Sequence, residues 1–94
     1  MMSNEQCFEL VAFYKSILKM RGYMAKRVDS LDRRPDPDMS YQHALYMLNR
    51  MEEFIKEGKR EKFFRWLGFV QGILWLLGDL TVEDLRNHNR SDAI

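Results

Sequence analysis

The stretch RWLGFVQGILWLLGD, residues 65–79, decides the fold of this chain, because its apolar side chains nearly encircle a helix. Three explanations are open: a membrane segment, a buried core helix, or a surface that meets a partner. A membrane-spanning helix needs about 20 apolar residues. The longest apolar stretch, Leu67–Leu77, is much shorter and is interrupted by Gln71 and two glycines. We therefore expect a helix of a globular domain and no membrane interaction.

Two apolar stripes run along this helix, which is predicted from about Lys59 to Leu77 and capped at its C-terminus by Gly78. The first stripe alternates steps of four and three residues, as in a coiled-coil seam, and comprises Phe63, Leu67, Val70, Leu74 and Leu77. The second stripe runs beside it and comprises Trp66, Phe69, Ile73 and Leu76. Each apolar stripe needs a neighbouring helix to cover it, so this helix is expected to lie at the centre of the bundle.

Gly68 and Gly72 form a small-xxx-small pair within the same helix. Such a pair lets another helix approach closely, because no Cβ atom stands between the backbones. Each glycine costs roughly 1 kcal/mol of helix stability, so a close contact is a reasonable explanation. The contacting helix belongs to the same chain or to a second copy, and the breadth of the apolar surface favours a dimer. Gln71 lies at the rim of that seam or is buried with a hydrogen-bond partner.

A first helix is predicted from Asn4 to about Val28, because apolar residues recur there at helical spacing. Ser3 or Asn4 can serve as its N-cap, and Gly22 marks a place where the helix could kink or end early. Its apolar stripe consists of Cys7, Leu10, Val11, Tyr14, Ile17, Leu18 and Met24.

Residues 29–40, DSLDRRPDPDMS, hold both prolines and form the only clear linker. A second amphipathic helix is predicted over Tyr41–Glu57, with Asp38 or Ser40 as its N-cap. Gly58 is the expected stop, although one longer helix that continues through it is the alternative. The apolar stripe of this helix is Tyr41, Ala44, Leu45, Leu48, Met51, Phe54 and Ile55.

A short fourth helix is predicted to start at Thr81, with Asp84 at the capping-box position. Val82 and Leu85 are expected to face inward. Residues 91–94 are expected to form a frayed tail.

The length and composition predict one packed domain over residues 1–94. A chain of 94 residues can enclose a single core, and 46% hydrophobic residues exceed what disordered chains contain. The expected fold is all-α: a small antiparallel bundle of three main helices with a short C-terminal helix, in which dimerisation could complete the core.

The charges do not predict a strong electrostatic interaction. The net charge of +1 provides no overall field that would hold a polyanion. Within residues 52–65 we expect a solvated face with Glu52–Lys56 and Glu61–Arg65 pairs one turn apart. The alternative function, nucleic-acid binding, would join the basic end of the first helix to the basic side chains of this segment, Lys56, Lys59, Arg60, Lys62 and Arg65.

No residue pattern predicts an enzyme, a metal site or a cofactor site. Cys7 is the only cysteine, so no intrachain disulfide can form and a cytoplasmic location is expected. His43 and His88 lie at no metal-ligand spacing. No serine lies in a nucleophile motif, and no glycine-rich loop is placed to hold a phosphate.

The polar segment 85–90, LRNHNR, follows the apolar helix directly. It is either a fraying C-terminal turn or a set of hydrogen-bond donors for an acidic or phosphorylated partner. Taken with the apolar helix, it completes our set of candidate contact residues. The self-association or partner contacts are Trp66, Gly68, Phe69, Gln71, Gly72 and Trp75, and the polar contacts are Arg65, Arg86, Asn89 and Arg90.

Residues 61–90 resemble a stretch of small uncharacterised accessory proteins of tailed bacteriophages. The similarity lies in an R-W-L-G-F-x-Q-G-x-L-W core followed by a short T-x-x-x-L-R-x-x-N-R helix. The matching positions here are Arg65, Trp66, Leu67, Gly68, Phe69, Gln71, Gly72, Leu74 and Trp75, then Thr81, Leu85, Arg86, Asn89 and Arg90.

The resemblance implies a phage protein made in the cytoplasm of a host bacterium, and it carries no catalytic residue. The function we expect is therefore non-enzymatic binding to a host or phage protein, which would modulate a host enzyme or a defence system. The resemblance covers about the last half of the chain and could begin at Met39, so residues 1–38 lie outside it.

Overall fold

The computed structural model describes residues 2–31, 33 and 35–90, and this part of the chain contains four helices and no strand. The helices are α1 (Asn4–Met20), α2 (Pro37–Lys56), α3 (Arg60–Leu76) and α4 (Val82–His88). The prediction of an all-α bundle with a short C-terminal helix is confirmed. None of these helices is long and apolar enough to cross a membrane. The predicted frayed tail, residues 91–94, lies outside the described residues.

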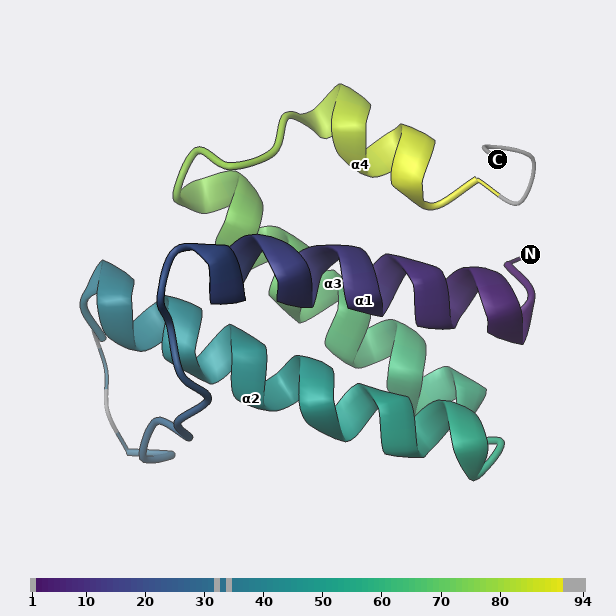
Figure 1. The fold of residues 1–94 in the computed structure, drawn as a ribbon, viewed down its shortest axis with the longest axis horizontal. Helices are drawn as coiled ribbons and strands as arrows, with labels where there is room; N and C mark the ends of the chain where they lie inside the picture. The colour runs from purple at the N-terminus through teal and green to yellow at the C-terminus, as the bar shows by residue number, and fades with distance from the viewer. Residues whose placement is uncertain (1, 32, 34, 91–94) are drawn as a thin grey trace.

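The helix at the centre of the packing is α2, and the prediction that α3 would be central is wrong. In Figure 1, α1 and α2 run side by side in opposite directions, while α3 crosses behind them and α4 returns above α1. α2 packs on both α1 and α3. Because α2 covers one side of α3 and other neighbours cover only part of the rest, one face of α3 remains open.

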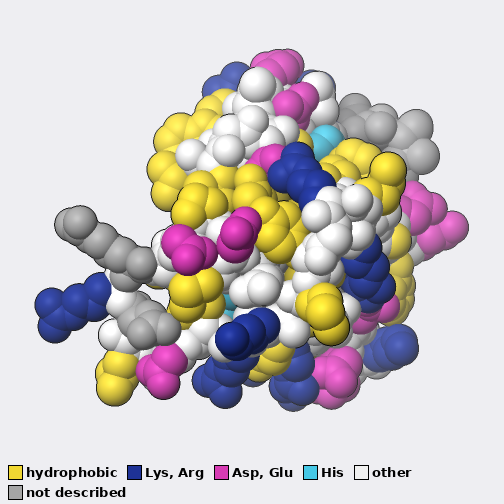
Figure 2. Space-filling model, turned by 60° about the vertical axis from the view of Figure 1, so that its left-hand side comes forward, with side chains coloured by type: hydrophobic (Ala, Val, Ile, Leu, Met, Phe, Trp, Pro, Cys, Tyr) yellow, Lys and Arg dark blue, Asp and Glu magenta, His cyan; other side chains and the backbone are white. Residues whose placement is uncertain are grey.

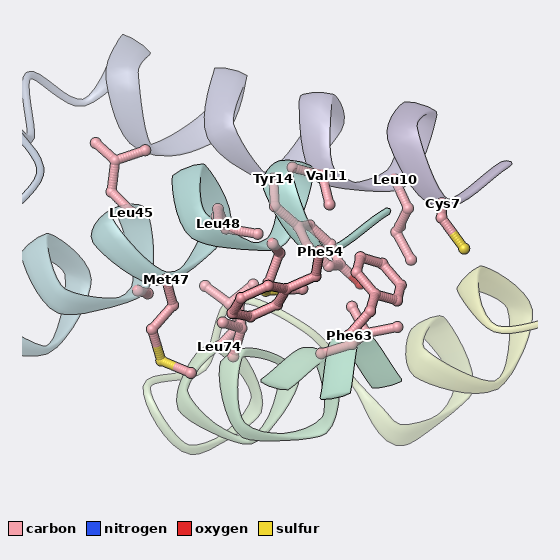
Figure 3. Close-up of a cluster of buried hydrophobic side chains, with 14 of the residues drawn as sticks. Cys7, Leu10, Val11, Tyr14, Leu45, Met47, Leu48, Phe54, Phe63 and Leu74 are labelled. Atoms are coloured by element: carbon pink, nitrogen blue, oxygen red, sulfur yellow. The ribbon is translucent and has the colours of Figure 1, made fainter. Parts of the chain in front are cut away.

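The apolar side chains of the three long helices meet in one core (Figure 3). Tyr14 and Leu18 of α1, Phe54 of α2, and Phe63 and Val70 of α3 are almost completely buried. In Figure 3 the labelled side chains of α1 point down onto those of α2 and α3. The coiled-coil-like stripe of α3 is therefore the stripe that enters the core.

α1 ends at Met20, eight residues before the predicted end at about Val28. The stop is Gly22, whose φ of 86° is a left-handed conformation that favours glycine. The amide of Tyr23 donates to the carbonyl of Leu18, which closes the last turn. Met24, expected in the apolar stripe, is therefore not helical and is 77% exposed.

α2 begins at Pro37, four residues before the predicted start at Tyr41. Its N-cap is Asp36, whose carboxylate accepts from the amide of Met39, so neither Asp38 nor Ser40 is the cap. A proline is favourable in the first turn of a helix, because the amide it lacks would have no partner there. The helix ends before Gly58, with a φ of 73°, which confirms a break between α2 and α3.

Two predicted N-caps hold. Ser3 caps α1 and forms a capping box with Gln6, and Thr81 forms the predicted capping box with Asp84 at the start of α4. The prediction that Val82 faces inward is wrong, because its side chain is 49% exposed. α4 contains no buried residue, so polar contacts have a larger share in holding it in place.

Candidate interaction surface

One face of α3 is open to solvent and carries large apolar side chains. Phe69 is 57% exposed, Trp75 is 52% exposed and Leu76 is 76% exposed. Residues three and four apart share a face of a helix, and the exposed positions of α3 follow this spacing. We call this surface the outer face of α3 and define it as Arg65, Gly68, Phe69, Gly72, Trp75 and Leu76.

Gly68 and Gly72 do not face another helix within the described part of the chain. A Cβ atom added at either position would meet nothing within 4 Å. Neither glycine has a positive φ, so the backbone does not require glycine there. The contact that would explain the pair is therefore not an intrachain helix packing among residues 2–31, 33 and 35–90.

Trp66, another predicted contact residue, lies away from the outer face. Its ring packs edge-on against Phe54 of α2, with ring centroids 4.8 Å apart and an interplanar angle of 89°. The ammonium group of Lys62 lies 5.9 Å from the centre of the indole ring. Trp66 thus belongs to the packing between α2 and α3.

Gln71 is buried within the chain, with 5% of its surface exposed. Its amide nitrogen donates to the hydroxyl of Tyr14 (3.0 Å) and to the side-chain oxygen of Asn89 (2.8 Å). Asn89 returns a hydrogen bond from its amide nitrogen to the side-chain oxygen of Gln71 (3.1 Å). This pairing satisfies the amide and joins α1 and α3 to the C-terminal end of α4.

The hydroxyl of Tyr14 also lies 2.8 Å from Nδ1 of His88. Tyr14 accepts from Gln71 and keeps its own proton, which it donates to Nδ1 in the His88 tautomer that carries its proton on Nε2. Burial raises the pKa of Tyr14 to about 12, an effect that the hydrogen bond from Gln71 opposes and the Asp84 carboxylate reinforces. We call Tyr14, Gln71, His88 and Asn89 the polar network.

A cavity of about 350 Å³ opens beside the outer face and is lined by residues from α3, by Met2 and by Asn89. Its α3 lining consists of Phe64, Leu67, Gly68 and Gln71. The wall is mostly apolar, and its polar groups, on Gln71 and Asn89, are hydrogen-bonded to each other. The cavity therefore extends the apolar character of the outer face towards α1.

Arg65 forms no ion pair with any residue that the structure describes, so the expected pair with Glu61 is absent. The expected pair of Glu52 with Lys56 is also wrong, because Glu52 pairs with Lys15 of α1. Arg65 is exposed on the outer face. Its positive charge is available to a partner.

Two of the other basic side chains, Arg60 and Lys59, are engaged by contacts within the chain. Arg60 donates to Asn4 and to the carbonyl of Met2, and Lys59 pairs with Glu57. On the side of the molecule in Figure 2, acidic and basic side chains are mixed with apolar ones. The mixed charges on this side do not form the continuous basic surface that the nucleic-acid alternative needs.

The two terminal arginines of the predicted polar contacts are exposed and weakly held. Arg86 lies 3.9 Å from Glu83, and Arg90 donates to Asn87 over 3.5 Å. Asn89, in contrast, uses its side chain within the polar network. The structure thus brings Asn89 to Gln71 and leaves Arg86 and Arg90 facing solvent.

A second cluster, which the sequence did not suggest, holds the loop after α3. Asp79 pairs with Arg21 and accepts a hydrogen bond from the hydroxyl of Tyr41, and the Arg21 guanidinium lies 5.5 Å from the centre of the Tyr41 ring. These residues come from three distant parts of the chain. No local pattern in the sequence could have identified their contact.

Within the described residues, no group of three or more histidine, cysteine, aspartate or glutamate side chains is arranged to hold a metal ion. Cys7 is buried, and burial raises the pKa of its thiol. A buried thiol with a raised pKa is a poor nucleophile, because the thiolate is the reactive form. Cys7 therefore acts as a small apolar residue of the core.

No protein-family model, curated protein or solved structure matches this chain.

Proposed function

We propose that this chain is a non-enzymatic binding protein that docks a protein partner on the outer face of α3. The observation that carries the proposal is the exposure of Phe69, Trp75 and Leu76 on one helix face, beside two glycines that no intrachain contact explains. Contiguous exposed apolar surface is typical of interaction sites. Tryptophan and arginine are the residues that most often dominate the binding energy of an interface.

The sequence resemblance supplies the biological setting of this proposal. A phage accessory protein made in a bacterial cytoplasm acts by occupying the surface of a host or phage protein, for instance a host enzyme or a component of a defence system. Such an action requires a stable shape and a binding face but no catalytic group. Exposed Arg65 at one end of the outer face would add a charge-assisted contact to an acidic or aromatic group.

The test is affinity capture from lysate of phage-infected bacteria, with the wild type beside Trp75→Glu. A charged side chain in an apolar interface costs binding energy, so the partner should be retained by the wild type and lost from the variant. Met20→Glu is the matched control, because Met20 is 88% exposed and lies at the end of α1, outside the outer face. Identical capture by all three proteins would overturn the proposal. A wild type that retains no protein at all, not even a tagged second copy of this chain, would overturn it as well.

A further inference from the structure

Two pairs of outer-face residues are placed symmetrically in the sequence about position 70, whereas the position that matches Phe69 is the buried Gln71. Gly68 and Gly72 lie two residues before and after position 70, and Arg65 and Trp75 lie five residues before and after it. At about 1.5 Å per residue, Arg65 and Trp75 are roughly 15 Å apart along the helix axis, too far to meet within one helix. The order of these residues is what an antiparallel pair of identical helices requires.

From this order we propose that the partner of the outer face is a second copy of this chain, with the two α3 helices antiparallel about a two-fold axis that passes between Gly68 and Gly72, level with Val70 but on the exposed side of the helix. The inference rests on the proposed function, because it uses the same face. A two-fold interface is formed by the same patch on both subunits, so each contact occurs twice. In this arrangement Gly68 of one copy lies opposite Gly72 of the other.

The glycines allow the two helix axes to approach closely. A Cβ atom added at either position would meet nothing within 4 Å, so the surface there is open to a second helix. Backbones separated only by glycine hydrogens gain van der Waals contact along the seam. The cost of two glycines in the middle of a helix is then offset in the dimer.

A contact between Arg65 of one copy and Trp75 of the other favours a second copy as the partner and the antiparallel direction of the two helices. Because they are equidistant from Val70, Arg65 of one copy lies level with Trp75 of the other. Arg65 has no ion pair among the described residues, and Trp75 is 52% exposed. A guanidinium over an indole face is a favourable cation–π contact. A parallel pair would instead place the two arginines together.

Phe64 and Leu76, one residue further from position 70 than Arg65 and Trp75, form a second matched pair, which is apolar. Phe64 and Leu76 lie six residues before and after Val70, so Leu76 of one copy comes level with Phe64 of the other. Phe64 lines the cavity of about 350 Å³ beside Gly68, and Leu76 is 76% exposed. The antiparallel pair therefore covers the most exposed side chain of the outer face with an apolar neighbour.

The first test is the association state of the full chain, measured by sedimentation over a wide range of concentration. The wild type is expected to dimerise, and Gly72→Leu to weaken the dimer by at least about tenfold, because the new side chain separates the helices. Asn49→Leu is the matched control, since it adds the same side chain at an exposed position of α2. A wild type that stays monomeric, or a dimer unaffected by Gly72→Leu, would overturn the inference.

The second test is the direction of pairing, measured by disulfide cross-linking of Gly68→Cys and Gly72→Cys chains. The antiparallel pair predicts that the mixture forms the Gly68→Cys to Gly72→Cys cross-link faster than either variant forms one with itself. Cys7 is buried and is not expected to interfere. Faster cross-linking of each variant with itself would indicate parallel pairing and contradict the proposed arrangement.

The third test is the cation–π contact. Arg65→Glu removes both copies of the contact and is expected to raise the dimer dissociation constant by about tenfold or more, whereas Arg65→Lys retains part of the affinity. An unchanged constant for Arg65→Glu would overturn the pairing of Arg65 with Trp75. If the chain is monomeric but Trp75→Glu still loses a protein captured from lysate, this inference fails while the proposed function stands.

Discussion

Gln71 of α3 connects three helices through its side-chain hydrogen bonds. Its side-chain amide uses both donors and its acceptor within the chain, with Tyr14 and Asn89 as partners. A buried amide without partners would cost roughly 1 to 3 kcal/mol. Because Tyr14 and Asn89 lie on opposite sides of Gln71 in the sequence, this one side chain fixes both α1 and α4 against α3.

Removal of the Tyr14 hydroxyl should destabilise the fold measurably. Tyr14→Phe leaves one donor of Gln71 and Nδ1 of His88 without their partner, so the free energy of unfolding should fall by about 1 to 3 kcal/mol. Urea unfolding measures the change. Tyr46→Phe is the control, because Tyr46 is half-buried and outside the polar network; an equal loss in both variants would contradict the role of the network.

The raised pKa of Tyr14 makes the stability of the folded state depend on pH in the alkaline range. The folded state raises this pKa from 10.0 to about 12, mainly through burial, so the unfolded chain releases the proton at lower pH than the folded chain does. The stabilisation is complete below pH 10 and is lost as the pH rises from about 10 to about 12. The pKa values of Tyr23 and Tyr41 are also raised, so titration of tyrosinate absorbance should show several late groups, of which the one near pH 12 disappears in Tyr14→Phe. Its absence from the wild type would contradict this assignment.

At the scale of the helices, the glycines of this chain have two different roles. Gly22, Gly58 and Gly78 end helices with positive φ values, a conformation that side chains with a Cβ atom rarely adopt. Gly68 and Gly72 lie within α3 in ordinary helical conformation and face open space. The glycines with positive φ end the helices and set the turns between them. Gly68 and Gly72 are required by no contact or backbone conformation within a single copy.

Alanine substitution should separate these two roles. Gly58→Ala is expected to destabilise the chain by about 1 to 2 kcal/mol, because it forces a Cβ atom into the left-handed region. Gly72→Ala is expected to stabilise the isolated monomer by up to about 1 kcal/mol, because alanine favours the helix and meets no neighbour. Thermal unfolding at low protein concentration measures both, and a destabilising Gly72→Ala would show that an intrachain contact needs the glycine.

On the scale of the whole molecule, α2 forms the centre and α4 the most weakly packed part. α2 has buried residues from Tyr41 to Ile55, whereas α4 has no buried residue. The N-terminal side of α4 is held through Asp79, which binds Arg21 and Tyr41. Its C-terminal side is held by the polar network. Hydrogen bonds and ion pairs therefore carry more of the attachment of α4 than apolar burial does.

This difference predicts the order in which the helices open. Backbone amides of α4 should exchange with solvent faster than those of α2, because local opening of α4 exposes little apolar surface. Asn89→Ala should accelerate exchange in α4 further and leave α2 unchanged, since it removes the pairing with Gln71. Hydrogen–deuterium exchange with residue resolution measures both effects. Equal protection of α2 and α4 would contradict this account of the packing.

The sequence by itself determined the class of fold, the number of helices and several of their ends. These features depend on local interactions: apolar spacing, capping boxes at Ser3 and Thr81, and a glycine at Gly58 that stops a helix. It failed at Pro37, where the proline was assigned to a linker although it lies in the first turn of α2. It also extended α1 to about Val28, because the apolar spacing continues beyond Gly22, whereas the alternative of an early end at Gly22 is the one that the structure has.

Only the tertiary structure decided which face of α3 is buried and what Gln71 binds. Both stripes of α3 have helical spacing, so periodicity alone could not distinguish the stripe that meets α1 and α2 from the face left open. The partners of Gln71, Tyr14 and Asn89, come from two other parts of the chain. Such contacts depend on how the helices pack, and the local sequence does not specify that packing. The sequence already predicted Gly68 and Gly72 as contact residues, but only the structure showed that no helix of the described chain covers them.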